Sequence, residues 1–350
     1  MEYEPVSTNQ HRHQIKELLH ALGPAFGPAI VFLSLKAYWS RIKQGRSPFS
    51  PTLIKKRQIL PKASLEGRAL SQEPYLRPVP YCDSHSPEVI AVADRFRQNT
   101  KSDWEYACAI YDYVRNEIVM ALEPAAPGGV AGTLEAGYGI CLDKSCALVA
   151  LARAGGIPAR FCKMGNIAFR DAESAPPDIR DLVHFVETLE SSKDWSLRKI
   201  GAGLMRRLKQ HLKSAGYGNA PVVGLHPVVE FKFGNTWIMA DPGRGDSEAI
   251  ASGLPLPRLG YDPMLMLGYT GTVIYRSETV PVGKSYWLVR RIMCMLARGA
   301  ADVVNNQLEE KRKEGERILS EIEKTDYIRG MRWRYVPLPS TVELGVPLAL

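Results

Sequence analysis

Residues 139–160 read GICLDKSCALVALARAGGIPAR, and this stretch decides the fold. Its apolar residues recur on one face at helical spacing, and Gly155-Gly156 supplies the residues that commonly end a helix. Cys141 therefore lies at the start of a predicted helix, where exposed backbone N–H groups favour the nucleophilic thiolate. Residues 157–169 predict a strand that follows the helix. Taken alone, Cys141 has a second interpretation as a small buried apolar side chain.

Residues 222–242, VVGLHPVVEFKFGNTWIMADP, predict a β-hairpin in which two apolar-rich strands flank a two-residue turn at Gly234-Asn235. Pairing continued outward from this turn places His226 diagonally opposite Asp241 on the same face of the hairpin. Diagonal neighbours lie about 7–8 Å apart at Cα, a gap that an imidazole and a carboxylate can close to a hydrogen bond.

Together these stretches supply the parts of a cysteine nucleophile site. A thiol nucleophile needs an imidazole that holds it as thiolate and later protonates the leaving group, and a third group that orients the ring. Cys141, His226 and Asp241 are the candidates for these roles. A single histidine in a strand is more often structural, but the paired acid favours the catalytic interpretation here.

Two motifs in this order resemble the transglutaminase-like superfamily of papain-like cysteine enzymes. The first runs from Gly-Ile-Cys-Leu-Asp at 139–143 to Gly-Ile-Pro-Ala-Arg at 156–160, and the second is His-x-x-x-Glu at 226–230 followed by Trp237 and Asp-Pro at 241–242. The resemblance covers about residues 86–243.

The resemblance implies an α+β fold, in which the helix that Cys141 opens packs on an antiparallel sheet. It also implies that Cys141 is the nucleophile, His226 the base and acid, and Asp241 the orienting carboxylate. An acyl-thioester intermediate would then pass to water, as in a hydrolase, or to an amine, as in an acyltransferase. The Cys141 backbone N–H would form one half of the oxyanion hole, and its second donor is unassigned. Three other motif positions are interpreted as structural: Asp143, Glu230 and Trp237.

The chain also departs from the family pattern. An insertion at 170–221 separates Cys141 from His226, so His184 within that insertion is a rival base, although it lacks a hairpin partner and the Trp…Asp-Pro continuation. Pro227 follows the histidine where relatives often carry a small or aromatic residue.

Three segments are expected along the chain. Residues 1–80 form an N-terminal helix and a proline-rich basic arm, residues 81–245 form the core, and residues 246–350 form a C-terminal extension with β and helical parts. The core begins with two helices, because Ser86 and Ser102 each precede an apolar helical stripe and have the pattern of an N-cap.

Composition and charge argue against several classes of protein. The 350 residues are 45% hydrophobic and 23% charged, which excludes a chain that is mainly disordered. Six cysteines without a CxxC pair argue against a disulfide scaffold or a zinc site, so we expect reduced thiols, no metal and no cofactor. The net charge of +8 favours anionic partners, but no nucleic-acid module is recognisable.

The expected function is therefore cysteine-dependent acyl transfer at an amide, peptide or thioester bond, in the cytoplasm. The alternative is a non-catalytic binding module that uses its groove, or the basic segment 193–213, to hold a protein such as an acidic carrier. The segment 193–213 is otherwise a lid or side helix. The apolar stretch 18–39 leaves peripheral or single-span membrane attachment as a further alternative, although prolines and charged side chains interrupt it.

Overall fold

The computed structural model describes residues 59–121, 129–169, 198, 202, 222–280 and 298–323. Several expectations fall outside these ranges and stay predictions: the membrane stretch 18–39, the rival base His184, and the basic segment 193–213 apart from residues 198 and 202. In the part of the chain that is described, no helix has the length and apolar character needed to cross a membrane.

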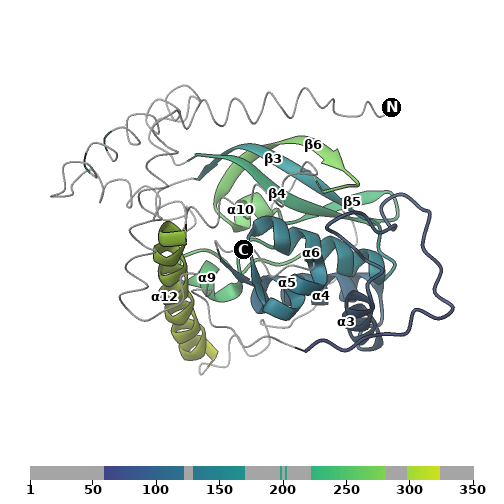
Figure 1. Cartoon of the computed structure of the whole chain (residues 1–350). Helices are drawn as coiled ribbons and strands as arrows, with labels where there is room; N and C mark the ends of the chain where they lie inside the picture. The colour runs from purple at the N-terminus through teal and green to yellow at the C-terminus, as the bar shows by residue number, and fades with distance from the viewer. Residues whose placement is uncertain are drawn as a thin grey trace.

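A four-stranded antiparallel sheet forms one layer of the fold, with its strands in the order β5-β4-β3-β6 (Figure 1). A separate, very short parallel pair joins β1 and β2. The strands are β1 (Val119–Met120), β2 (Tyr138–Gly139), β3 (Ala159–Phe169), β4 (Val222–Phe233), β5 (Thr236–Ala240) and β6 (Tyr269–Ser277).

The predicted hairpin is present in the predicted register. Phe233 of β4 pairs with Thr236 of β5, and the ladder continues to Val229 opposite Ala240. Gly234 has φ of 58°, the sign that a primed turn requires at its first central position and that glycine adopts without strain. The turn therefore fixes which residues of the two strands lie opposite one another, and it directs the end of β5 toward the start of β4.

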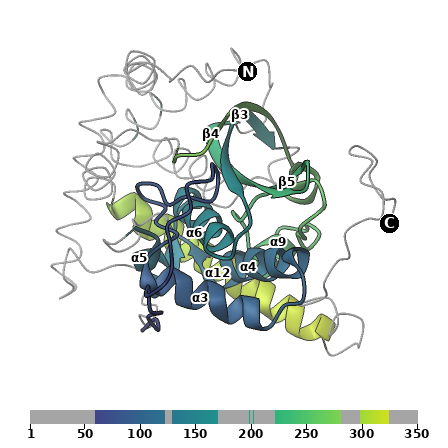
Figure 2. The ribbon, with the colours of Figure 1, turned by 90° about the vertical axis from the view of Figure 1, so that its right-hand side faces the viewer.

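Helices form the second layer, in which α6 packs on β3 and β4 and contacts α3, α4 and α5 (Figures 1 and 2). The two predicted N-caps are confirmed, since the Ser86 and Ser102 hydroxyls accept the backbone N–H groups of Val89 and Glu105. The helices are α3 (Pro87–Gln98), α4 (Asp103–Glu117), α5 (Gly129–Ala136), α6 (Cys141–Ala154), α9 (Asp246–Ile250), α10 (Pro263–Met266) and α12 (Arg298–Glu323).

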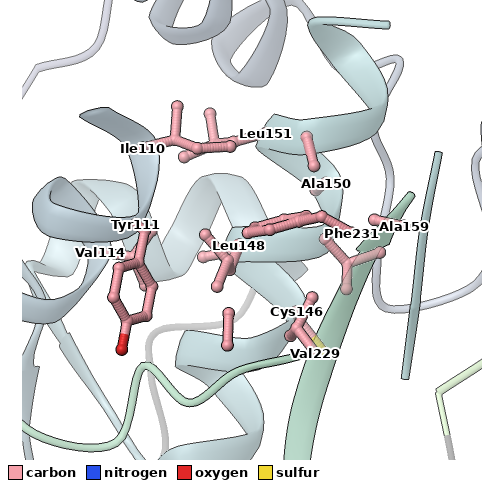
Figure 3. Close-up of a cluster of buried hydrophobic side chains, with 14 of the residues drawn as sticks. Ile110, Tyr111, Val114, Cys146, Leu148, Ala150, Leu151, Ala159, Val229 and Phe231 are labelled. Atoms are coloured by element: carbon pink, nitrogen blue, oxygen red, sulfur yellow. The ribbon is translucent and has the colours of Figure 1, made fainter. Parts of the chain in front are cut away.

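The main hydrophobic core surrounds α6. Leu148 and Leu151 of this helix pack with Ile110 of α4 on one side and with Val229 and Phe231 of β4 on the other, and all five are completely buried (Figure 3). Each fully buried side chain of this size contributes about 1.5–3 kcal/mol to folding. Because helices and sheet enclose α6 from opposite sides, its position relative to β4 is fixed by the core itself.

The α+β class and the helix-on-sheet arrangement are confirmed. The sequence analysis predicts no helix between the second helix and Cys141, but the glycine-rich residues Gly129–Ala136 form α5. Val130 and Leu134 are buried in the main core one helical turn apart, so tertiary packing outweighs the weak local helix signal.

The C-terminal segment is joined closely to the core. Strand β6 extends the sheet by pairing with β3, and α12 packs on α9. Gly315 permits this helix contact, because a Cβ at that position would overlap the backbone carbonyl of Ser247. The boundary expected at residue 245 stays a prediction, but the sheet itself continues beyond it.

Candidate active site

Cys141 is the first residue of α6, as predicted, and its side chain is partly exposed. The preceding Ile140 is the N-cap residue, and its backbone N–H donates to Oδ2 of Asp143 at 3.0 Å. Gly139 has no room for a side chain, since a Cβ there would lie 2.6 Å from Cβ of Asp143. Asp143 therefore holds the turn that enters the helix, which agrees with its structural interpretation.

His226 and Asp241 meet across the hairpin as the register predicts. Nε2 of His226 lies 2.7 Å from Oδ2 of Asp241. The histidine side chain is 18% exposed and the aspartate side chain 1%, so the carboxylate lies behind the ring, away from solvent. The other carboxylate oxygen, Oδ1, accepts the backbone N–H of Gly243 at 2.8 Å.

The thiol of Cys141 also reaches the imidazole. Burial alone would lower the pKa of His226, but the Asp241 carboxylate and hydrogen bonding to Asp241 and Cys141 more than offset this and hold the pKa well above 6.5. Because Nε2 is engaged by Asp241, Nδ1 is the ring nitrogen left for the thiol. The three candidate residues are therefore brought together, with the imidazole in the middle.

Asp241 is held in its charged form. Burial would raise its pKa, whereas the charge of His226 and hydrogen bonds from His226, Tyr269 and the Gly243 backbone lower the pKa below 3.8 overall. A carboxylate that stays ionised beside a protonated imidazole keeps the proton on the ring, where it can later be transferred.

These two shifts predict how the pair contributes to stability at different pH. The raised pKa of His226 gives a contribution to the free energy of unfolding that is complete below about pH 6.5, the pKa of histidine in the unfolded chain. This contribution is lost as the pH rises through the pKa of His226 in the folded protein. The lowered pKa of Asp241 gives a contribution to the free energy of unfolding that is complete above about pH 3.8 and is lost as the pH falls. We therefore expect His226→Gln to lower the free energy of unfolding most between about pH 4 and 6.5. The difference from the wild type should decrease toward pH 9. Urea unfolding at several pH values measures this difference, and a difference independent of pH would contradict the charged pair.

A direct bond joins the helix of Cys141 to the strand of His226. Ser145, one turn along α6, donates its hydroxyl to the backbone oxygen of Pro227 at 3.1 Å. The proline at this position therefore does not disturb the site: its carbonyl anchors the strand to the helix, and the next residue, Val228, is completely buried.

Glu230 and Trp237 do not join the site; they form a structural cluster with Arg160. Nε of Arg160 donates to Glu230 at 2.6 Å, and its guanidinium lies 3.8 Å from the centroid of the Trp237 ring. Arg276 of β6 donates to the same carboxylate at 3.0 Å. These contacts tie β3, β4, β5 and β6 together, in agreement with the structural interpretation of Glu230 and Trp237.

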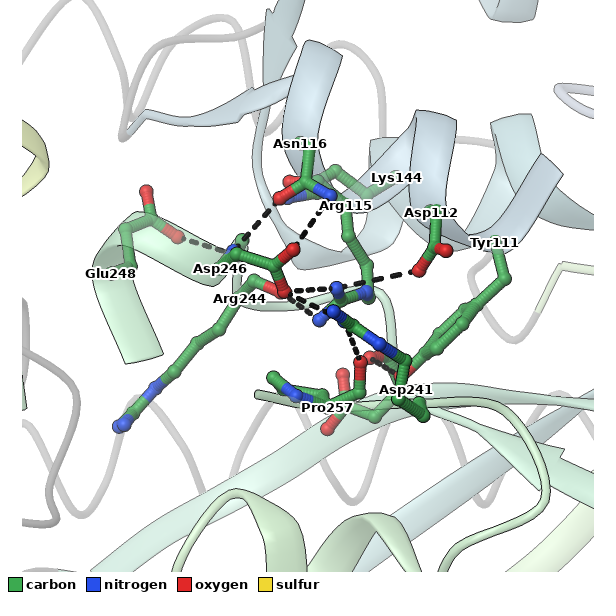
Figure 4. Close-up of polar contacts among 12 residues, drawn as sticks. Tyr111, Asp112, Arg115, Asn116, Lys144, Asp241, Arg244, Asp246, Glu248 and Pro257 are labelled. Atoms are coloured by element: carbon green, nitrogen blue, oxygen red, sulfur yellow. Dashed lines mark hydrogen bonds and ion pairs between the residues drawn. The ribbon is translucent and has the colours of Figure 1, made fainter. Parts of the chain in front are cut away.

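Buried charges hold the segment that follows Asp241 (Figure 4). Arg115 of α4, whose side chain is completely buried, contacts Asp246 at 2.5 Å and Asp112 at 3.4 Å. Arg258 reaches the same Asp246 carboxylate at 3.0 Å.

A buried lysine connects this network to α6. Lys144, next to Asp143 in α6, donates to the backbone oxygen of Arg115 at 3.1 Å. Burial lowers the pKa of this lysine to about 8, although Glu248 and Asp241 act in the opposite direction. The network links the start of α6 to the loop that carries Asp241.

The described residues offer no group of three His, Cys, Asp or Glu side chains arranged to hold a metal ion. The five cysteines within these ranges are not paired in disulfides. Three of them, at positions 82, 146 and 162, are buried, and burial raises the pKa of the Cys82 thiol to about 12. Cys141 and Cys108 are the partly exposed ones.

Comparison with known proteins shows what the core of this chain is similar to. No curated protein matches this chain in sequence. A solved structure named "Putative Cysteine Protease" from Cytophaga hutchinsonii is similar at 18% identity and a TM-score of 0.31, over 58% of this chain and 51% of that one, so the chain spans about half the length of that protein. Residues 90–242, which include Cys141, His226 and Asp241, match the family model of the transglutaminase-like superfamily. The part of the chain that carries the candidate site is therefore similar to the transglutaminase-like superfamily.

Proposed function

We propose that this protein is a cysteine-dependent acyl-transfer enzyme that acts on an amide, peptide or thioester bond. The observation that carries the proposal is the position of one imidazole between two partners. His226 binds Asp241 through Nε2 at 2.7 Å and interacts with the Cys141 thiol, which begins a helix and is partly exposed. A nucleophile, its base and the group that orients the base are thus in contact.

In the first half-reaction the Cys141 thiol has given its proton to His226. The sulfur attacks the carbonyl carbon of the substrate, an S–C bond forms, and the carbonyl oxygen takes up negative charge. The backbone N–H of Cys141, at the start of α6, is proposed to donate to this oxygen and so to favour that charge. When the tetrahedral intermediate collapses, His226 gives its proton to the leaving amine or thiol, and the acyl group remains on Cys141 as a thioester.

In the second half-reaction neutral His226 accepts a proton from water or from an amine. The oxygen or nitrogen attacks the thioester carbonyl, the S–C bond breaks, and the Cys141 thiolate is regenerated beside a protonated imidazole. Hydrolysis and transfer use the same residues and differ only in the nucleophile that enters. Asp241 serves both steps because it stabilises the protonated ring and fixes its orientation.

Trapping of the acyl-enzyme tests the proposal. We expect p-nitrophenyl acetate or an acetyl thioester to place one acetyl group on Cys141 within seconds, with peptide mapping by mass spectrometry as the readout. Cys141→Ala should lose the adduct, and Cys108→Ser should keep it, because Cys108 is the other partly exposed cysteine among the described residues but lies within α4. Acetyl groups spread equally over both cysteines would contradict the proposal.

The same variants separate catalysis from binding alone. If the protein is a binding module, Cys141→Ala should keep its biological activity, because a thiol is not needed to fill a groove. If acyl transfer is the function, Cys141→Ala should abolish that activity while its melting temperature stays close to that of the wild type.

A further inference from the structure

A tyrosine outside the matched family region reaches the proposed site. Tyr269 opens β6, beyond residue 242 where the family match ends. Its side chain is 4% exposed, and its hydroxyl lies 2.8 Å from Oδ2 of Asp241. This is the oxygen that also binds Nε2 of His226. The C-terminal segment thus contributes a contact to the carboxylate of the core.

We propose that Tyr269 is a positioning residue that fixes the Asp241 carboxylate in the orientation that His226 requires. The inference rests on the proposed function, because it assigns Tyr269 a role only if the imidazole works on Cys141. Oδ1 of Asp241 is held by the Gly243 N–H at 2.8 Å and Oδ2 by the Tyr269 hydroxyl at 2.8 Å. With both oxygens held, the carboxylate cannot rotate about its terminal torsion, which is otherwise a soft one.

The hydroxyl acts as a donor throughout the working pH range. Burial and the neighbouring Asp241 charge raise the pKa of Tyr269 well above 10, so the phenol stays protonated. A hydrogen bond to an ionised acceptor is stronger than one between neutral groups, which makes this contact well suited to fixing geometry. The tyrosine ring also meets the His226 ring edge-on, with centroids 6.0 Å apart, and so limits the tilt of the imidazole.

The sheet holds Tyr269 in place independently of the site. Its backbone pairs with Phe169 of β3, and the residue belongs to a second buried cluster with Met164, Val228 and Leu267. A phenylalanine at position 269 keeps this packing and removes only the hydroxyl. Tyr269→Phe is therefore expected to fold.

Tyr111 provides a matched control. It is 2% exposed, and its hydroxyl donates to Asp241 at 3.1 Å, but the acceptor is the backbone oxygen and not the carboxylate. Tyr111→Phe and Tyr269→Phe thus each remove one buried phenolic hydroxyl bonded to the same residue. Their effects on the melting temperature should be similar, and their effects on the site should differ.

The experiment measures two quantities in the full chain: the rate constant for alkylation of Cys141 by iodoacetamide, and the titration midpoint of His226 by NMR. Tyr269→Phe should lower the rate about 10-fold and lower the midpoint by about half a pKa unit or more, because a carboxylate that keeps only the Gly243 N–H besides the imidazole is held less firmly toward the ring and stabilises the imidazolium less. Tyr111→Phe should change the rate less than about 2-fold and leave the midpoint in place.

Two outcomes overturn the inference: an unchanged or raised midpoint in Tyr269→Phe, or equal rate losses in both variants. A His226→Ala variant measured alongside separates this failure from that of the proposed function. If His226→Ala slows alkylation and Tyr269→Phe does not, only the role of Tyr269 is wrong. If His226→Ala alkylates at the wild-type rate, the proposed function itself is wrong.

Discussion

Replacement of His226 by alanine is expected to slow the alkylation of Cys141 by iodoacetamide about 100-fold at pH 7, within the range that a positioned acid–base group contributes. The expected loss follows from the direct contact between the imidazole and the thiol. The imidazole is the group that interacts with the thiol, and its raised pKa means that it can remain protonated beside a thiolate at neutral pH. Without it, the sulfur loses the cation that favours its charged form. Quenched time points followed by mass spectrometry give the rate constant directly.

The matched control for this substitution is His85→Ala. His85 is also partly exposed, but it lies in the turn before α3, where its backbone N–H donates to the Asp83 carboxylate. Its removal should leave the alkylation rate of Cys141 unchanged. An equal loss of rate in both variants would point to a general disturbance of the protein, and no loss in His226→Ala would separate the thiol from the imidazole.

Arg115→Met is expected to destabilise the protein by about 3–5 kcal/mol, the cost of removing one partner from a buried ion pair. The side chain of Arg115 is completely buried between Asp246 and Asp112, and the Asp246 side chain is 3% exposed. Methionine fills part of the volume but leaves Asp246 with Arg258 as its remaining cation. Burial already raises the pKa of Asp112 to about 6 against the opposing effect of Arg115, so the loss of this cation favours the neutral acid further.

Urea unfolding of Arg115→Met and of Arg317→Met compares a buried arginine with an exposed one. Arg317 of α12 pairs with Glu314 and Glu321 on the surface, where solvent screens the attraction, and its replacement should change stability little. Similar stability of Arg115→Met and the wild type would show that the buried network does not hold α4 to the loop after Asp241.

The sequence was most informative where local rules determine geometry. The turn at Gly234-Asn235 set the pairing register, and that register predicted the contact between His226 and Asp241 that the structure shows at 2.7 Å. The helix that begins at Cys141 followed in the same way from apolar spacing and from the glycines that end it. These features depend on residues close together in the chain or related across one tight turn.

The features that the sequence did not reveal depend on tertiary contacts between distant segments. Tyr269 lies in a strand whose place beside β3 is not determined by its own composition, so its contact with Asp241 had no local signal. Arg115 and Asp246 look like ordinary surface charges in the sequence, and their burial follows from how α4 packs against the start of α9. The helix α5 was hidden for the same reason, since its stability comes from the core it packs on.

The central claim is that Cys141 is the activated thiol of this protein. Parallel alkylation of Cys141 and Cys108 in the intact wild-type chain at pH 7 tests it most directly, because both thiols are partly exposed and Cys141 interacts with the His226 imidazole. The account predicts that Cys141 reacts at least about 10-fold faster than Cys108, as expected of a thiol that an adjacent imidazole activates. Equal rates at the two positions would contradict it.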